Sequence, residues 1–315
     1  MEAKLAVNGF GFVARYGEKD VERVLLPLLM RLTELQAERD GRLIAFLAAP
    51  PGAGKSTLAA FMEWLSRRTP EATPLQAVGM DGFHYPNAYL GAHSFVDEDG
   101  REVGMRSRKG APQTFDVEGL RAALADARSD APAPWPTYSR VMHDVVPASL
   151  PIDEKILLVE GNYLLLDEGR WTSLAELADY TVFLSAPEAL LRKRLVARKV
   201  AGGSTPEEAR AWYEASDGRN VARVLAHHSP ADLELALRAD GGSRLRDGFG
   251  HEPESTSRQR GRFPSWREVL SNSCVLDVAE TVTQEGPRGV GLGVLMTRCS
   301  HWREDLRSGP RRQPW

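Results

Sequence analysis

The chain has 315 residues, a length that fits one large domain or two modest ones, and its 42% of hydrophobic residues can form a sizeable core. Its 40 basic and 43 acidic residues nearly cancel, and a net charge of −3 gives no overall attraction for nucleic acid or an anionic membrane. The two cysteines, Cys274 and Cys299, are too few for a disulfide framework or a zinc site with four cysteine ligands.

The first 40 residues predict an antiparallel hairpin followed by a helix. Apolar residues alternate with others on both sides of Asn8-Gly9, a dipeptide whose residues accept the positive φ angles of a tight hairpin turn. Apolar residues then recur at helical spacing from Val21 to Leu35. Asp20 is a candidate N-cap for this helix, and Pro27 indicates a kink or a later start. We expect residues 1–40 to pack on the domain that follows.

From residue 41 onward, buried strands alternate with helices. Four continuous apolar runs are typical of strands covered on both faces: 43–47, 75–80, 156–159 and 180–184. Further along, Thr205-Pro206-Glu207-Glu208 is a capping box with proline in the first helical turn. The alternation predicts an α/β fold, with a mostly parallel sheet flanked by helices, over residues 41–236.

A phosphate-binding loop follows the first of these runs. Residues 49–57 match the pattern G-x-x-x-x-G-K-[ST], except that Ala49 replaces the first glycine. Gly52 and Gly54 let successive backbone N–H groups face phosphates at a helix N-terminus. Lys55 is expected to reach the β- and γ-phosphates, and the Ser56 hydroxyl to coordinate Mg²⁺. The alternative is a glycine-rich turn without a ligand. The predicted nucleotide site consists of Ala49, Pro50, Pro51, Gly52, Ala53, Gly54, Lys55, Ser56 and Thr57.

Acidic residues end the next two apolar runs, at the sheet edge where parallel α/β folds bind ligands. Asp81 is a candidate base that accepts the proton of an attacking hydroxyl, or else a turn or helix cap. His84 and Tyr85 either line an acceptor pocket or pack under the loop. Glu160 stands where an acid holds Mg²⁺ directly or through water, with a purely structural role at the strand end as the alternative.

Three further segments hold polar residues that suit substrate binding. Lys109 opens one segment, and Tyr138, Arg140 and His143 stand in an extended second one; all four are candidates for contact with the acceptor. No partner at ligand spacing supports a metal role for His143. The third segment, 191–199, carries cations three and four residues apart before a Gly202-Gly203 hinge. It is either a solvated helix face or a lid that closes over the phosphates, and we favour the lid.

The segment 237–315 lacks the periodic order of the preceding domain. It is rich in arginine, glycine and serine, and residues 275–278 and 290–296 alone have weak strand character. We interpret it as a poorly ordered, arginine-rich extension or a small appendage without a sizeable core. It lacks the interleaved aromatic residues and zinc pattern that favour nucleic-acid binding, so we do not expect that function.

Five motifs occur in one order along the chain. They are the phosphate loop, Met-Asp-Gly-Phe-His-Tyr-Pro-Asn at 80–87, Lys-Gly-Ala-Pro-x-Thr-Phe-Asp at 109–116, Pro-x-Tyr-x-Arg-x-x-His-Asp at 136–144 and Val-Glu-Gly-Asn-Tyr-Leu-Leu-Leu at 159–166. As a set they resemble the P-loop kinase superfamily of uridine kinase, phosphoribulokinase and bacterial pantothenate kinase. The resemblance is greatest to its bacterial nucleoside/nucleotide kinase-like branch, also labelled fructose-transport-system kinase. It extends from the hairpin to about residue 236 and implies a P-loop NTPase fold.

The resemblance implies an ATP-dependent kinase that uses Mg²⁺ and phosphorylates a hydroxyl of a small metabolite. Within it, Asp81 matches the catalytic base and Glu160 the acid linked to Mg²⁺. Arg194 and Arg198 match lid arginines that act in catalysis with Lys55. Tyr138 and His143 match the stretch that contacts the acceptor, and Asn220 belongs to a late Asp-Gly-Arg-Asn motif near the nucleotide base.

The acceptor itself stays open among a nucleoside, a sugar, a ribose phosphate and a pantothenate-like molecule. The rival interpretation is a P-loop NTPase that acts as a regulatory switch or chaperone without a small-molecule acceptor. We expect a small-molecule partner, with neither nucleic acid nor a membrane, and a homodimer is one state that fits such a kinase. The chain starts without a signal-peptide pattern and has no apolar run of ~18 residues, so we expect a cytoplasmic protein.

Overall fold

The computed structural model describes residues 1–7, 10–129, 133–237 and 243–245. All of these residues lie within the unit Met1–Val282. Both cysteines, the predicted turn at Asn8-Gly9 and the weak strand patterns at 275–278 and 290–296 lie outside the described residues. Within the described ranges, no helix combines the length and apolar character needed to cross a bilayer.

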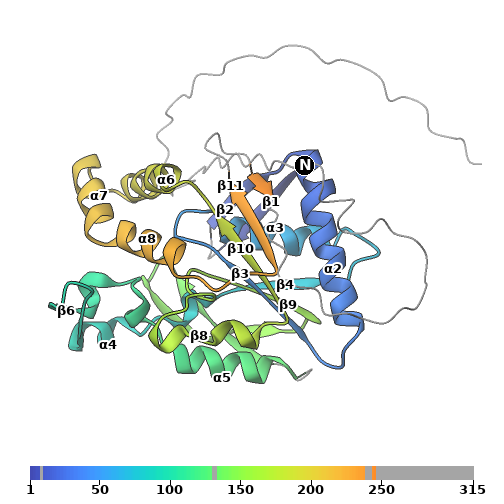
Figure 1. Ribbon diagram of the computed structural model, residues 1–315, viewed down its shortest axis with the longest axis horizontal. Coiled ribbons are helices and arrows are strands. Elements are labelled where there is room, and N and C mark those ends of the chain that lie inside the picture. Colours follow the sequence, from blue (N-terminus) through green and yellow to red (C-terminus); the bar gives the residue numbers. More distant parts are fainter. Residues whose placement is uncertain (8–9, 130–132, 238–242, 246–315) are drawn as a thin grey trace, which may run out of the picture. The chain divides into compact units, whose positions relative to one another are not determined.

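A six-stranded sheet carries the fold (Figure 1). Across the sheet the strands are β12 (Ser243–Leu245), β11 (Leu233–Leu237), β10 (Tyr180–Ser185), β3 (Leu43–Ala48), β9 (Ile156–Gly161) and β4 (Leu75–Gly79). Neighbouring strands are parallel except β12, which pairs antiparallel with β11. Every residue of β3 and β9 is buried, as expected for strands covered on both faces. The predicted α/β fold is therefore confirmed.

Two hydrophobic cores cover the two faces of this sheet. Leu43 and Leu47 of β3 belong to a core shared with one set of elements, whereas Ile44 and Phe46 belong to a core shared with another. The first set is β1 (Glu2–Val7), β2 (Phe10–Arg15), α2 (Leu26–Ala37) and α3 (Lys55–Ser66). The second is α5 (Val117–Ala127) and the hairpin of β7 (Ala133–Ser139) and β8 (Asp144–Ile152). Each large apolar side chain that is fully buried contributes about 1.5–3 kcal/mol, so both faces are firmly held.

The N-terminal hairpin forms as predicted, with β1 and β2 antiparallel and Leu5 opposite Phe12. Asp20 directly precedes the helical turn that starts at Val21, as predicted, but its side chain makes no capping hydrogen bond there. Gly17 is the N-cap of the first helical turn, α1 (Glu18–Asp20), and Asp20 is a buried residue inside that turn. A π-helical turn, Val21–Leu25, then leads into α2. Pro27 lies in the first turn of α2, and its lack of an N–H accounts for the widened turn before it.

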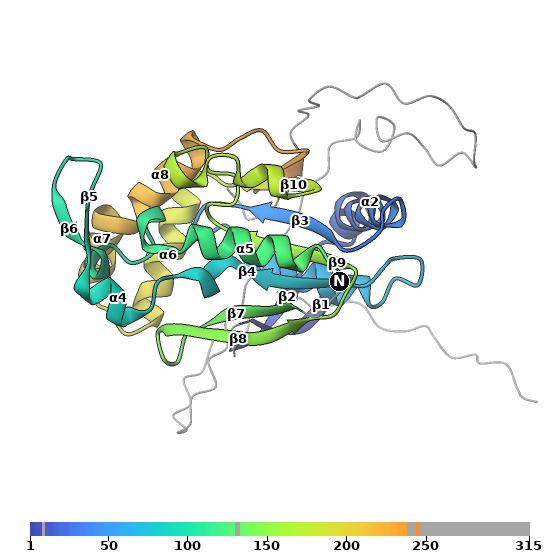
Figure 2. The same cartoon turned by 90° about the horizontal axis from the view of Figure 1, so that it is seen from below.

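The remaining helices and short strands gather at the end of the sheet where the parallel strands finish (Figure 2). They are α4 (Asn87–Ala92), β5 (Ser94–Val96), β6 (Glu102–Gly104), α6 (Glu188–Ala201), α7 (Pro206–Trp212) and α8 (Gly218–Ala226). Short 3-10 turns occur at Met80–Phe83, Met105–Arg108, Pro112–Thr114, Gly169–Trp171 and Leu174–Leu177, and a π turn at Tyr213–Asp217 joins α7 to α8. The predicted capping box is present, because Thr205 and Glu208 each accept the other's backbone N–H.

The C-terminal edge of the sheet differs from the sequence expectation. Apolar periodicity places the domain boundary at residue 236, yet β11 continues to Leu237 and β12 adds three residues from beyond that point. The register pairs Leu235 with Leu245 and Leu237 with Ser243. Residues 243–245 therefore extend the sheet that carries the site.

Candidate active site

The phosphate loop connects β3 to α3. Gly52 and Gly54 have φ angles of 83° and 91°, which strain any residue with a Cβ atom, so the loop requires glycine at both positions. Ala49 is fully buried and does not adopt a positive φ, so alanine meets the conformational needs of the first position. Helix α3 begins at Lys55, directly after Gly54. This strand–loop–helix arrangement directs backbone N–H groups and a helix N-terminus at one place, as phosphate binding requires.

Three polar groups meet beside this loop at the ends of β3 and β9. The Ser56 hydroxyl donates a hydrogen bond of 2.7 Å to Oε1 of Glu160, and Nζ of Lys55 lies 3.9 Å from Oε2. Burial raises the pKa of Glu160, while the charge of Lys55 and the hydrogen bond from Ser56 lower it. A hydroxyl and a carboxylate are hard oxygen ligands of the kind Mg²⁺ prefers. Among the described residues no cluster of three His, Cys, Asp or Glu could hold a metal, so Mg²⁺ here would take its other ligands from phosphates and water.

Asp81 lies in the turn that follows β4. Gly79, the last residue of β4, pairs with Glu160, so the turn starts beside the acid of β9. The charge of Asp81 raises the pKa values of both Glu160 and Tyr138, so its carboxylate is within electrostatic reach of both residues. Its carboxylate makes no hydrogen bond or ion pair with another described residue. The cap of this turn is Gly79, so the alternative role of Asp81 as an N-cap is not supported.

The turn that holds Asp81 is docked against β7. A Cβ atom on Gly82 would collide with the carbonyl oxygen of Pro136, so only glycine allows the two backbones to approach this closely. Nε1 of Trp135 donates a 2.9 Å hydrogen bond to the carbonyl of Gly79 and secures the same contact. This packing sets the distance between Asp81 and Tyr138.

The acceptor side brings together three of the predicted residues: His84, Lys109 and Tyr138. The His84 ring lies 5.4 Å from that of Tyr138, and Nζ of Lys109 lies 4.9 Å from the centroid of the same tyrosine. Burial lowers the pKa of His84, with the charge of Lys109 acting in the same direction and Asp81 opposing both. Burial also lowers the pKa of Lys109, and Asp144 partly offsets this effect. The cluster therefore joins aromatic, cationic and hydrogen-bonding groups on one side of Asp81.

Asn87 and Asp144, which were not predicted from the sequence, organise this cluster. Nζ of Lys109 donates to Oδ1 of Asn87 at 2.7 Å and to the carbonyl of His143 at 2.8 Å. Asn87 donates its side-chain amide to the same carbonyl and its backbone N–H to Oδ1 of Asp144. The motifs at 80–87 and 136–144 end in these two residues, which is the one signal that could have found them.

The other predicted acceptor residues are placed differently. His143 has a φ of 52° and contributes its carbonyl to the cluster. Tyr85 stacks on Tyr89 with ring centroids 4.3 Å apart, and its hydroxyl accepts a 3.5 Å hydrogen bond from Arg170. Arg140 is exposed, and its charge lowers the pKa values of Glu160 and Tyr138.

The predicted lid helix packs on the phosphate loop. Nη1 of Arg194 lies 3.4 Å from the carbonyl oxygens of both Gly52 and Ala53, and the Leu195 side chain leaves no spare room above Gly52. Burial raises the pKa of Asp217, and the charges of Arg198 and Lys199 further along α6 lower it. Arg194 therefore joins α6 to the phosphate loop.

Asn220, predicted near the nucleotide base, is buried against the segment that contains Lys109. Its Nδ2 donates to the carbonyl of Gly110 at 3.3 Å, and the Tyr163 hydroxyl donates to the same carbonyl at 2.6 Å. Its Oδ1 is buried and makes no hydrogen bond with the part of the chain that the structure describes.

Known proteins resemble this chain over the kinase-like domain. No protein-family model matches it. It is 41% identical to YggC, an uncharacterized protein of Escherichia coli (strain K12), over 242 residues that cover 76% of this chain and 98% of YggC. A solved structure from Silicibacter sp. TM1040, provisionally named a fructose transport system kinase, has 30% identity and a TM-score of 0.60. This match covers 67% of the present chain and 98% of the other.

A pantothenate kinase of Corynebacterium aurimucosum is 32% identical over 187 residues, which cover 53% of this chain and 57% of that kinase. The chain thus spans little more than half the length of this relative. Together with the fold and the phosphate loop, these similarities assign the chain to the P-loop kinase superfamily of uridine kinase, phosphoribulokinase and pantothenate kinase. The family predicted from the five motifs is confirmed.

Proposed function

We propose that the protein is an ATP-dependent kinase that transfers the γ-phosphate to a hydroxyl of a small metabolite, with Mg²⁺ as its metal. One observation supports this above the others. The carboxylate of Asp81 makes no hydrogen bond or ion pair with another described residue, and its charge raises the pKa values of Glu160 on one side of the site and of His84 and Tyr138 on the other. A free carboxylate within reach of both a phosphate site and a polar pocket is suited to activate an acceptor hydroxyl.

The residues divide into a nucleotide side and an acceptor side. Lys55 and the loop N–H groups hold the phosphates, while Ser56 and Glu160 would hold Mg²⁺, which when bound neutralises phosphate charge. Asp81 takes the proton of the acceptor hydroxyl while the hydroxyl oxygen forms a bond to the γ-phosphorus. At the same time, the bond between the γ-phosphorus and the oxygen that bridges to the β-phosphate breaks. Arg194, with Arg198 further along α6, stabilises the negative charge of the transferring group.

The rival function, a P-loop NTPase that switches a protein partner, needs no pocket for a small acceptor. The test is therefore acceptor dependence. Purified protein is mixed with Mg·ATP and, separately, uridine, pantothenate, ribose 5-phosphate and a hexose, and ADP release is measured with transfer of labelled γ-phosphate to the acceptor. We expect one class of acceptor to raise ADP release at least about tenfold and to carry the label. Hydrolysis that no acceptor accelerates would favour the switch.

A further inference from the structure

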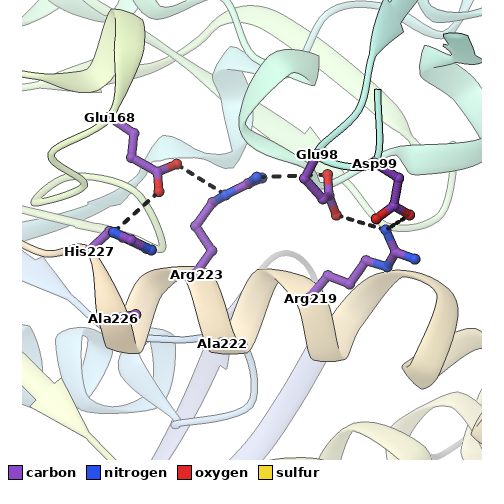
Figure 3. A pocket seen from close by; sticks show the side chains of 8 residues that line it. All are labelled: Glu98, Asp99, Glu168, Arg219, Ala222, Arg223, Ala226 and His227. Carbon is purple, nitrogen blue, oxygen red and sulfur yellow. Dashed lines mark hydrogen bonds and ion pairs between the residues drawn. The ribbon is translucent and has the colours of Figure 1, made fainter. Parts of the chain in front are cut away.

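Ion pairs join α8 to the β5–β6 hairpin (Figure 3). Glu98, in the turn of that hairpin, accepts a 3.1 Å hydrogen bond from Nη1 of Arg219, and its other oxygen lies 3.7 Å from Arg223. Asp99 accepts a second bond from Arg219 at 2.9 Å. These groups line an open pocket of about 410 Å³, whose charges are already paired with one another.

Glu98 also reaches a third guanidinium, which Figure 3 does not draw. Nη2 of Arg108 donates to Oε1 of Glu98 at 3.1 Å, and Arg108 is only 7% exposed. A buried guanidinium is costly without a charged partner, and Arg108 has two: Glu98, and Asp97, whose Oδ2 lies 3.7 Å from Nη1 of Arg108. Burial raises the pKa of Glu98, but hydrogen bonds from its own backbone, Arg219 and Arg108 lower it to about 2. Glu98 therefore stays ionised at neutral pH.

A second contact from α8 reaches the same segment two residues later. Asn220, next to Arg219 on the helix, donates to the carbonyl of Gly110, which has a φ of 100°. The segment 108–110 is therefore held on both sides of Lys109: Arg108 through Glu98, and Gly110 directly. Between these two points, Lys109 extends toward Asn87 and Tyr138 in the acceptor cluster.

We propose that Glu98 and Asn220 form a clamp that positions Lys109 for binding the acceptor. The inference rests on the proposed function, because it assigns Lys109 to the acceptor pocket. Glu98 contacts the side chain of Arg108 and Asn220 the carbonyl of Gly110, so both act on Lys109 through its chain neighbours and are positioning residues. Because Asn220 is the last residue of the Asp-Gly-Arg-Asn motif, the clamp also gives that motif a role on the acceptor side.

Two substitutions loosen the clamp at its separate points, and a third is a matched control. Glu98→Gln removes the carboxylate that joins Arg108 to α8 and leaves Asp97 as the remaining charged partner of Arg108. Asn220→Asp replaces the amide donor to Gly110 with an acceptor of the same shape. Asp99→Asn is the control, because Asp99 pairs with Arg219 in the same pocket but has no contact with Arg108. Glu98→Asp keeps the negative charge, so we expect Lys109 to be held better in this variant than in Glu98→Gln.

The first readout needs no acceptor. Lysines of the folded protein are pulse-labelled with acetic anhydride, and the rate at Lys109 is compared with that at exposed Lys193 in the same sample by mass spectrometry. Loosening the clamp should expose Lys109 and raise the ratio about threefold or more in Glu98→Gln and Asn220→Asp, with Asp99→Asn unchanged. An unchanged ratio in both folded variants would overturn the clamp even if the protein proves to be a kinase.

The second readout uses the acceptor found with the wild-type protein. The KM for the acceptor should rise about fivefold or more in both clamp variants, while the KM for ATP changes less than about twofold. A merely structural role would instead lower kcat and the melting temperature and leave the acceptor KM unchanged. If the wild-type protein transfers phosphate to no acceptor, the proposed function fails, and the labelling ratio still decides whether the clamp positions Lys109. Should Glu98→Gln fail to fold, Asn220→Asp carries both readouts.

Discussion

The Ser56 hydroxyl donates a 2.7 Å hydrogen bond to Oε1 of Glu160, a residue 104 positions away in the sequence. The contact exists because β3 and β9 are neighbouring parallel strands, so the loop after one strand and the end of the other reach the same edge of the sheet. Lys55 adds a positive charge 3.9 Å from the second oxygen of the same carboxylate. Two distant segments thus supply the hydroxyl, ammonium and carboxylate that a metal-bound phosphate requires.

Replacing Lys55 tests the nucleotide side. Lys55→Ala removes a charge aimed at the phosphates, which by analogy with other electrostatic donors is worth roughly 3–4 kcal/mol. We expect kcat/KM for transfer to fall at least ~100-fold, with Lys193→Ala as the exposed-lysine control. Because Lys55 lowers the pKa of Glu160, that pKa should rise further in the variant. Transfer at the wild-type rate in Lys55→Ala would show that the loop is not the nucleotide site.

Replacing Asp81 separates a base from a ligand. Asp81→Asn keeps the shape of the side chain but cannot accept a proton, so acceptor-dependent transfer should drop ~10²–10⁴-fold. The affinity for ATP, measured by titration calorimetry, should hardly change because Asp81 is assigned to the acceptor. Loss of ATP binding, with residual transfer in proportion to the ATP bound, would make Asp81 a nucleotide or metal ligand instead.

The Ser56 hydroxyl can be tested through the metal. Ser56→Ala removes one oxygen ligand and the hydrogen bond to Glu160, so the Mg²⁺ concentration for half-maximal transfer should rise about tenfold or more. ATP binding in the presence of EDTA serves as the internal control and should be unaffected. An unchanged Mg²⁺ requirement would mean that the metal binds without this hydroxyl.

The ion pairs of Glu98 predict how stability depends on pH. Its pKa is about 2 in the folded protein against an ordinary value of 4.5. Because the folded pKa is the lower one, its stabilising effect is complete above the ordinary value and is lost as pH falls from about 4.5 to about 2. In Glu98→Gln the melting temperature should vary less with pH across this window than in Asp99→Asn, as measured by circular dichroism. Equal slopes for the two variants would contradict the assignment.

A shortened chain tests the proposed domain boundary. We expect the fragment 1–245 to fold and to retain ATP-dependent transfer. All residues assigned a role precede Val221, and the sequence after 245 lacks the apolar periodicity that offsets the entropy of ordering. A fragment ending at Asp240 also lacks β12 and shows what that edge strand contributes. At this size, each kcal/mol of lost stability lowers the melting temperature by ~2–4 °C. A melting temperature of either fragment more than about 8 °C below that of the full chain would therefore exceed the effect of a minor contact. It would show that the removed residues pack on the core.

The sequence was most informative where burial is complete. The strands β3, β9 and β10 were predicted because residues covered on both faces must be apolar, which leaves nearly continuous apolar runs. Strand β4, at the edge of the sheet opposite β12, is partly buried and was predicted from a mostly apolar run that includes Gln76. Strand β11 has partly buried residues, and the edge strand β12 is only three residues long, so neither leaves such a pattern. Asp20 has the residue type of an N-cap and precedes the turn at Val21, but its buried side chain makes no capping hydrogen bond there.

The candidate site was predictable wherever chemistry requires a particular side chain. The phosphate loop, Asp81 and Glu160 could be predicted for this reason. His143 shows the limit, because its backbone carbonyl, which any residue possesses, binds Lys109. Glu98 shows another limit. Its three guanidinium partners come from positions 108, 219 and 223, and only the fold reveals that these positions meet.

Ala49 has a consequence for how such loops are recognised in other sequences. The two glycines with left-handed backbones are Gly52 and Gly54, whereas position 49 is a buried site in which a small side chain is accommodated. A search pattern that insists on glycine at the first position would pass over this chain and any other whose loop begins with alanine. A pattern built on the two left-handed positions and the lysine that follows them would retain both kinds.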